Sequence, residues 1–100
     1  MTSMQPGRKL DLAFSREIRK LRENAGLSQT GLAAELGVDQ SLVSRVEAGS
    51  RQLTIGQAMF WLQGLGLDCE AASSLVARLW VHNGARPSSF WKSETHHDSE

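Results

Sequence analysis

Apolar residues recur every three or four positions along most of the chain between residues 11 and 82. That spacing places them on one side of a helix and is typical of amphipathic helices packed around a core. Breaks in the pattern divide the chain into five helices, at about 11–24, 29–36, 40–48, 55–65 and 69–82. The pattern therefore predicts an all-α fold of five helices.

Residues that begin and end helices stand at the breaks in this pattern. Side chains that can accept a hydrogen bond from the first helical amides precede four of the five runs. These residues are Ser28, Asp39, Thr54 and Asp68. Glycine follows the first four runs, where a left-handed backbone can end a helix without steric cost. These glycines are Gly26, Gly37, Gly49 and Gly66.

The apolar stripes of the first four helices predict which side chains form the core. The expected core residues are Phe14, Ile18, Leu21, Ala25, Leu32, Ala33, Leu36, Leu42, Val43, Val46, Ile55, Ala58, Met59, Leu62 and Leu65. Val38, in the turn between the second and third helices, is expected to pack inward as well.

The last two helices carry more apolar side chains than a small core needs. In the fifth helix these side chains spread over roughly 180°, against about 100° for a helix that only covers a core. Excess apolar surface of this kind predicts an interface between two copies of the chain. The predicted interface residues are Phe60, Trp61, Leu75, Leu79 and Trp80. The alternative is that the wide arc wraps the core and that Phe90 and Trp91 cover the remainder.

The length of 100 residues is sufficient for one small domain. We expect a flexible arm at residues 1–9, the folded domain at 10–84 and a disordered polar tail at 85–100. No apolar run is long enough to cross a membrane, and no secretory signal begins the chain. The single cysteine fits a reducing compartment, so the expected localisation is cytoplasmic and associated with the nucleoid.

Residues 28–49 (SQTGLAAELGVDQSLVSRVEAG) form the most informative segment of the chain. They are interpreted as two short helices joined by a glycine turn, the second helix having one apolar and one polar side. The polar side carries Gln40, Ser41, Ser44 and Arg45. This pattern predicts a helix-turn-helix, in which the second helix lies in the major groove of DNA.

The segment VDQSLVSRVEAG resembles the recognition-helix segment of the lambda-repressor-like, or Xre-type, transcriptional regulators. Before it, IRKLRENAGLSQTGLA resembles the family's first helix and the start of its second. After it, SRQLTIGQAMFWLQGLGLD resembles the family's loop and fourth helix. The resemblance covers residues 12–67. It implies a five-helix domain that binds a near-palindromic operator in double-stranded DNA as a homodimer.

The resemblance also implies roles for individual residues. Base contacts are expected from Gln40, Ser41, Ser44 and Arg45. Contacts to DNA phosphates are expected from Ser28, Gln29, Arg51 and Gln52. Arg22 and Glu47 match a structural ion pair that links the first helix to the third. The chemistry suits base reading, because glutamine can bond N6 and N7 of adenine and arginine can bond O6 and N7 of guanine.

Three residues depart from the family pattern. Gly31 stands where a glutamate often completes a capping box. Ala48 stands where an asparagine often reaches a phosphate, and Val46 replaces a frequent tryptophan. Because each change removes a contact or shortens a side chain, together they predict weaker binding by one copy and more reliance on a partner.

The predicted function is transcriptional regulation, as a repressor or autoregulator. Eleven basic and eleven acidic residues give zero net charge, whereas a basic surface is usual for DNA-binding domains. This balance leaves open a protein-interaction module that keeps the fold but has lost DNA binding. Within the DNA-binding class, SRQLTI and the compact form resemble restriction–modification controller proteins and equally Xre-type antitoxins. A toxin or RNA polymerase would then be a protein partner.

No grouping of serine, histidine and carboxylate and no glycine-rich phosphate loop is visible in the sequence, so the chain is not predicted to be an enzyme. No cofactor is predicted. His96 and His97 have no cysteine or acidic residue at metal-ligand spacing, and no metal site is predicted. Cys69, at the start of the fifth helix, is expected to be a small packed side chain.

Overall fold

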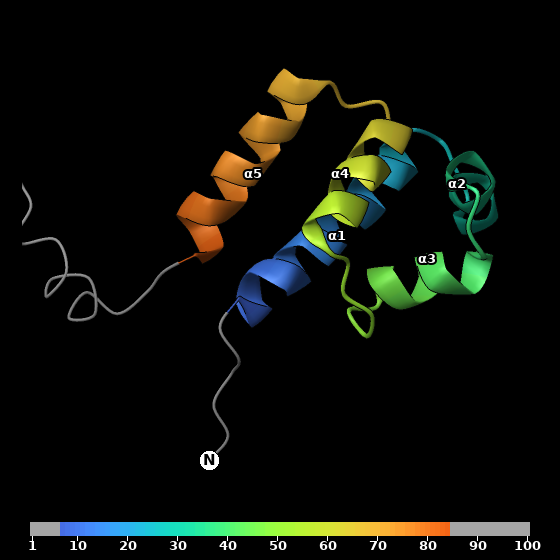
Figure 1. Cartoon of the computed structure of the whole chain (residues 1–100), viewed down its shortest axis with the longest axis horizontal. Coiled ribbons are helices and arrows are strands. Elements are labelled where there is room, and N and C mark those ends of the chain that lie inside the picture. The colour runs from blue at the N-terminus through green and yellow to red at the C-terminus, as the bar shows by residue number, and fades with distance from the viewer. Residues whose placement is uncertain (1–6, 85–100) are drawn as a thin grey trace, which may run out of the picture.

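The computed structural model describes residues 7–84, which fold into five α-helices joined by short loops (Figure 1). The helices are α1 (Arg8–Asn24), α2 (Gln29–Leu36), α3 (Gln40–Glu47), α4 (Ile55–Gly64) and α5 (Cys69–Asn83). This range contains no strand, so the all-α prediction is confirmed. None of the helices within it is long and apolar enough to cross a membrane.

Part of what the sequence predicts lies outside the described residues. This part comprises residues 1–6 of the expected arm and the whole expected tail, residues 85–100. The tail includes Phe90, Trp91, His96 and His97.

The helix starts follow the predicted capping residues at three of four positions. The side chains of Ser28 and Asp68 each accept a hydrogen bond from the amide three residues further on, at 2.9 and 2.8 Å. Thr54 and Gln57 form a complete capping box, with bonds of 3.1 and 2.9 Å in the two directions. Asp39 precedes α3 with an extended backbone, but its side chain makes no capping hydrogen bond. The first turn of α3 is therefore left without this contribution of about 1 kcal/mol.

Helix α1 begins at Arg8, three residues earlier than the pattern predicted. The expectation that Arg8 and Lys9 belong to a flexible arm is therefore wrong. Nη2 of Arg8 donates a hydrogen bond to the carbonyl oxygen of Gly49 at 3.2 Å, which holds the first turn of α1 against the end of α3. Since the partner lies 41 positions away in the sequence, no local pattern could have revealed this contact.

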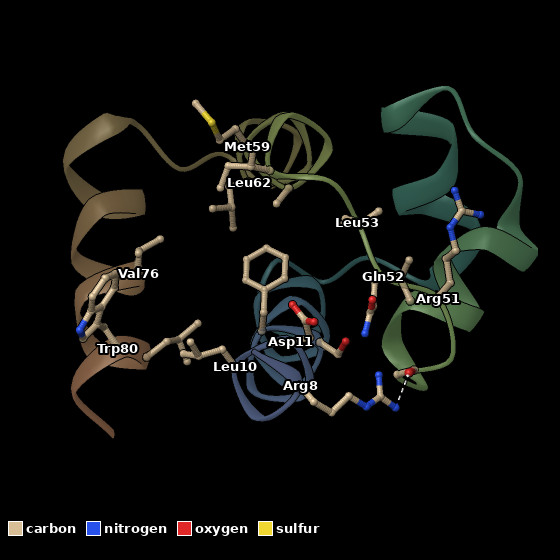
Figure 2. Close-up of a pocket in the computed structure, with 17 residues that line it drawn as sticks. Arg8, Leu10, Asp11, Arg51, Gln52, Leu53, Met59, Leu62, Val76 and Trp80 are labelled. Carbon is tan, nitrogen blue, oxygen red and sulfur yellow. Dashed lines mark hydrogen bonds between the residues drawn. The ribbon is translucent and has the colours of Figure 1, made fainter. Parts of the chain in front are cut away.

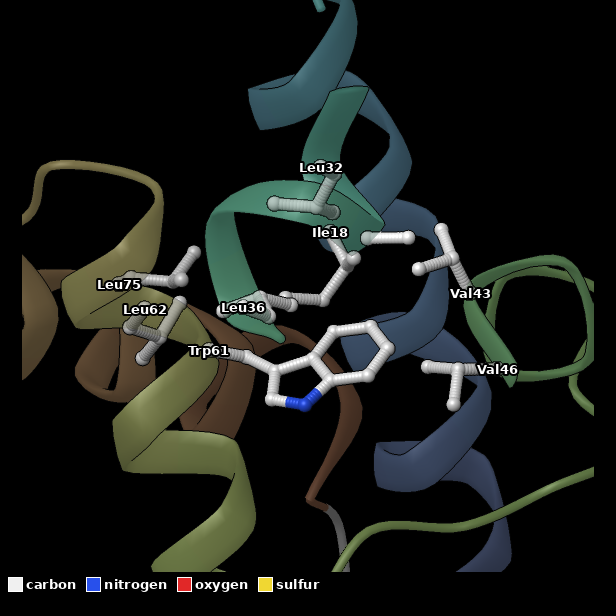
Figure 3. Close-up of a cluster of buried hydrophobic side chains, with 9 residues drawn as sticks. Ile18, Leu32, Leu36, Val43, Val46, Trp61, Leu62 and Leu75 are labelled. Carbon is white, nitrogen blue, oxygen red and sulfur yellow. The ribbon is translucent and has the colours of Figure 1, made fainter. Parts of the chain in front are cut away.

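The core lies where the five helices meet, and Figure 3 shows most of its side chains. Its buried apolar residues are Ile18, Leu32, Ala33, Leu36, Val43, Val46, Trp61, Leu62 and Leu75. The indole of Trp61 extends from α4 toward Val43 and Val46 (Figure 3). It thus supplies aromatic volume beside Val46, the position at which the resemblance implies a frequent tryptophan.

Helix α4 is rotated relative to the prediction, so that Ala58, Leu62 and Leu65 lie inward as predicted but two other predicted core residues do not. Ile55 and Met59, both predicted core residues, are 80% and 60% exposed, whereas Trp61 is only 2% exposed. The inward row is Ala58, Trp61, Leu62 and Leu65. This row and the predicted one both have helical spacing and only apolar members, so periodicity alone could not choose between them.

Four further predicted placements need correction. The sequence places Trp61 and Leu75 between two copies, but both are buried in the core of their own chain and cannot contact a partner. Ala25, predicted to be a core residue, follows the last residue of α1 and is exposed, because the chain turns away there. Cys69, predicted to be packed, is exposed at the start of α5.

Gly64, near the end of α4, allows α4 to approach α2 closely. A Cβ atom at Gly64 would overlap Cδ2 of Leu36, which is itself buried in the core. Gly56, in the first turn of the same helix, has no atom within 4 Å of such a Cβ. We expect Gly64→Ala to lower the free energy of unfolding by about 1–3 kcal/mol through overpacking.

Gly56→Ala is the matched control for this prediction. It is expected to raise the free energy of unfolding by about 0.4–1 kcal/mol, because alanine restricts the unfolded chain without creating a clash. Urea denaturation followed by circular dichroism measures both variants. Equal effects of the same sign would contradict the close approach of α4 to Leu36.

Candidate nucleic-acid interface

Helices α2 and α3 are joined by a tight turn at Gly37, whose φ of 72° is the left-handed conformation that favours glycine. The amides of Gly37 and Val38 bond back to the carbonyl oxygens of Ala34 and Ala33, at 3.3 and 3.0 Å. Val38 packs against the core, as predicted. These contacts fix the turn that leads into α3 relative to the end of α2.

Helix α3 has one buried and one open side. Val43 and Val46 are fully buried, whereas Gln40, Ser41 and Arg45 are exposed. Ser44 is only partly exposed. Helices α2 and α3 lie at the end of the molecule opposite α5 (Figure 1). Within residues 7–84 the polar side of α3 is thus open to solvent.

A chain of hydrogen bonds connects this open side to the interior. Nε2 of Gln40, at the start of α3, donates to Oε1 of Gln29 at 2.8 Å. Nε2 of Gln29, at the start of α2, donates in turn to Oε1 of Glu47 at 3.1 Å. The sequence predicted a phosphate contact for Gln29 and a base contact for Gln40, but not that the two side chains meet.

The predicted pair of Arg22 and Glu47 forms in the structure. Nε and Nη2 of Arg22 donate to Oε2 and Oε1 of Glu47, at 2.6 and 2.9 Å. Nη1 of Arg22 donates to the carbonyl oxygen of Leu27 at 2.8 Å. The two side chains are only 10% and 4% exposed. The pair therefore ties α1 to α3 across a largely dry contact.

The surroundings of Glu47 shift its ionisation. Burial by itself would raise the pKa of Glu47, but hydrogen bonds from Arg22 and Gln29 outweigh it and hold the pKa below the ordinary value. The hydrogen bond to Glu47 raises the pKa of Arg22. Both groups are therefore charged at neutral pH.

The candidate phosphate-binding residues lie in two places. Ser28 and Gln29 stand at the start of α2, where helical amides favour an anion. Arg51 and Gln52 are exposed in the loop after α3. Their side chains diverge in Figure 2, with the Gln52 amide turned toward the start of α1 and Arg51 pointing away from it. Arg51 is thus the better placed of the two loop side chains to reach a ligand.

A second surface feature is an apolar groove between α1, α4 and α5, with a volume of about 350 Å³ (Figure 2). Phe14 and Leu62 are among the residues that line it. Met59, Val76 and Trp80 line its walls, and Trp80 is 65% exposed. Leu79 is partly buried at the same groove, and Phe60, on α4, is exposed. Of the five predicted interface residues, Phe60, Leu79 and Trp80 therefore remain accessible.

Two short helices joined by a glycine turn, with a buried and an open side on the second helix, define a helix-turn-helix protein. The chain belongs to the helix-turn-helix domain family, whose model matches residues 13–74. The resemblance to Xre-type regulators is thereby confirmed. A comparison with curated proteins gives no match.

Two solved structures of a restriction–modification controller protein, C.Esp1396I, are similar to this chain. One is the tetramer of that protein in complex with its natural 35-base-pair operator, with 26% identity and a TM-score of 0.63 over 72% of this chain and 93% of that chain. The other is a point mutant of the same protein, with 26% identity and a TM-score of 0.64 over 82% of this chain and 98% of that chain.

Proposed function

We propose that this protein is a sequence-specific DNA-binding transcriptional regulator, a repressor or autoregulator, that places α3 in the major groove. The observation that carries the proposal is the open polar side of α3, with Gln40 held at its first turn by Gln29. In helix-turn-helix proteins, side chains in the first turns of this helix reach base edges. Gln40, Ser41, Ser44 and Arg45 are the proposed base-contacting residues.

Phosphate contacts on both sides of α3 would position the helix in the groove. We assign them to Ser28, Gln29, Arg51 and Gln52. Ser28 uses its hydroxyl oxygen as an acceptor for the α2 cap, which leaves the hydroxyl hydrogen to donate to a phosphate. The zero net charge means that these local contacts, rather than a general basic surface, must supply the attraction to DNA.

The groove between α1, α4 and α5 is the proposed interface of a homodimer. Leu79 and Trp80 remain in this groove from the sequence prediction, and the exposed Met59 and Val76 line it beside them. Phe60 is exposed on α4 but is not part of the groove lining. A twofold dimer would place two α3 helices about 34 Å apart and would require a near-palindromic operator. The similar controller protein is a tetramer on its operator, which supports self-association here.

Control of a restriction–modification system is the more specific function that the comparisons favour. The similarity to C.Esp1396I supports this choice over an antitoxin, since the loop sequence SRQLTI fits both classes equally. A toxin or RNA polymerase as an additional partner stays a prediction from the sequence. An antitoxin would co-purify with the product of its neighbouring gene, whereas a controller protein would not.

A titration with DNA tests the proposal. Fluorescence polarisation of a labelled duplex from upstream of the protein's own gene should show a saturable complex. Its affinity should fall steeply as salt is raised, because bound phosphates release counterions. A protein-interaction module that has lost DNA binding would give no specific complex with this duplex or with any other.

Replacing Arg45, the longest of the four proposed base-contacting side chains, tests the assignment of α3 as the helix that contacts bases. Arg45→Ala is expected to weaken binding by about 1–3 kcal/mol and to relax the preference at one base pair, as for an arginine bound to guanine. Arg16→Ala, at an exposed position of α1 outside the site, is the matched control and should leave binding unchanged. An equal loss on every DNA sequence would show instead that Arg45 contacts a phosphate.

A further inference from the structure

We infer that Arg8, at the start of α1, is a positioning residue for Arg51 and thereby for one of the proposed phosphate contacts. This role rests on the proposed DNA-binding function, because Arg51 is a loop side chain assigned to a phosphate. Arg8 itself was assigned no part in that interface. It acts through the backbone of Gly49, which stands at the beginning of the loop between α3 and α4.

The hydrogen bond between Arg8 and Gly49 joins the first turn of α1 to the chain just after α3. Nη2 of Arg8 donates to the carbonyl oxygen of Gly49 at 3.2 Å, the dashed line in Figure 2. Gly49 follows the C-cap residue of α3 and is buried, with a φ of 81°. A cation is favourable at this end of a helix, because the last carbonyl oxygens lack partners within the helix and carry the negative end of its dipole.

A second contact from α1 holds the same glycine. A Cβ atom at Gly49 would come within 2.7 Å of Cδ2 of Leu12, so Leu12 packs directly against the glycine backbone. Leu12 follows Arg8 by four residues, and side chains with that spacing lie on the same face of a helix. One face of α1 therefore holds Gly49 both at its carbonyl oxygen and beside its Cα.

Arg51 follows this fixed point by two residues. The amides of Ser50 and Arg51 both donate to the carbonyl oxygen of Arg45, at 3.0 and 3.2 Å, and the Ser50 hydroxyl donates to the same oxygen at 3.2 Å. The backbone that leads to Arg51 is thus held from within α3 and, through Arg8, from α1. The Arg51 side chain is exposed and forms no ion pair within residues 7–84, so it is available to a phosphate.

A held backbone favours a phosphate contact because less freedom remains to be lost on binding. A long side chain on a loosely held loop must order both the loop and itself when it meets DNA. Arg8 orders the loop beforehand, which leaves only the side chain of Arg51 to be ordered. The guanidinium of Arg8 is directed at Gly49, so its contribution to DNA binding is indirect.

Amide hydrogen exchange of the free protein tests whether Arg8 holds the loop. Arg8→Met removes the donors and should speed exchange of the Ser50 and Arg51 amides by roughly 3- to 10-fold, the equivalent of one hydrogen bond. Lys9→Met is the matched control, because Lys9 is the neighbouring exposed cation and forms no ion pair in the part of the chain that the structure describes. It should leave both amides unchanged. Wild-type exchange rates in Arg8→Met would overturn the inference.

Fluorescence polarisation with the duplex from upstream of the gene tests whether Arg8 acts through Arg51. Arg8→Met should weaken the complex by roughly 3- to 10-fold per bound chain, with base preferences unchanged, as expected for a phosphate contact. In an Arg51→Met background the same change should cost less than about twofold, because the contact through which Arg8 acts is already absent. Arg8→Lys keeps a donor and a positive charge, and should recover most of the wild-type affinity.

Two results in this titration would overturn the inference while the proposed function stands. If Arg8 contacts a phosphate directly, the losses from Arg8→Met and Arg51→Met multiply, and each change lowers the salt dependence by about one counterion per chain. If Arg51→Met leaves affinity unchanged, there is no contact for Arg8 to position. Thermal melts establish that each variant is folded, and Arg8→Gln, shorter and uncharged, replaces Arg8→Met if the latter does not fold. A wild-type protein that forms no saturable complex refutes the proposed function itself, which is a distinct outcome.

Discussion

Replacing Arg22 with methionine is expected to lower the free energy of unfolding by about 3–5 kcal/mol. Methionine fills a similar volume, but it leaves the carboxylate of Glu47 buried without its cation, which is the costly way to break a buried pair. The side chains of Arg22 and Glu47 are 10% and 4% exposed, so solvent cannot replace the lost partner. Urea denaturation followed by circular dichroism measures the loss.

An exposed pair on the same helix provides the control. Arg19 and Glu23 lie 3.1 Å apart with side chains 63% and 51% exposed, and such pairs contribute less than about 1 kcal/mol. Arg19→Met should therefore change stability little. The double variant Arg22→Met with Glu47→Leu should recover most of the loss, because no buried charge remains. Similar losses from Arg19→Met and Arg22→Met would contradict the role of the buried pair.

The pair also predicts how stability depends on pH. The pKa of Glu47 in the folded chain lies below the ordinary value of 4.5. Its contribution to stability is therefore complete above about pH 4.5 and is lost as the pH falls through the pKa of the folded state. In Arg22→Met, burial without a cation raises the pKa of Glu47. Protonation of Glu47 in acid then removes the buried charge and stabilises that variant. The difference in the free energy of unfolding between the wild-type protein and Arg22→Met should therefore narrow as the pH falls from about 7 to about 4.

Replacing Trp61 with alanine is the second change with a large expected effect, a loss of about 3–5 kcal/mol in the free energy of unfolding. The indole is 2% exposed and extends toward Val43 and Val46 in Figure 3, so its removal opens a cavity under α3. Thermal and urea denaturation at low protein concentration would measure this loss for the single chain.

Trp80→Ala also removes an indole, but from the lining of the groove, where the side chain is 65% exposed. It should change the stability of the single chain by no more than about 0.5 kcal/mol. As an interface anchor, it should cost at least about 2 kcal/mol of dimer affinity, measured by analytical ultracentrifugation. If Trp80→Ala leaves association unchanged while Trp61→Ala weakens it without unfolding the chain, the interface has been placed on the wrong surface.

Much of the fold could be predicted because local rules determine it. Helix ends were predictable where a cap or a glycine acts within a few residues, as at Ser28, Gly37 and Thr54. The start of α1 was not, because Arg8 is held by Gly49 from the far end of the helix-turn-helix. The rotation of α4 was also beyond local rules, since its apolar residues surround so much of the helix that only the shape of the other helices selects Trp61.

The candidate site likewise combines features that local sequence rules predict with features that depend on contacts between distant residues. The polar side of α3 is visible as a sequence pattern, because it depends only on helical spacing from Gln40 to Arg45. The link between Gln29 and Gln40 is not visible, because it arises from the angle that the Gly37 turn imposes between two helices. Resemblance located Arg22 and Glu47, but it did not show that Gln29 adds a third donor to the same carboxylate.

The open groove between α1, α4 and α5 has a consequence for regulation. Suppose that two chains must associate through this groove before either α3 can bind an operator. The concentration of the active dimer then grows with the square of the chain concentration while monomers predominate. A doubling of synthesis would then raise the active form roughly fourfold, by mass action alone. Dimerisation would in this way convert a gradual accumulation of chain into a steeper rise in promoter occupancy.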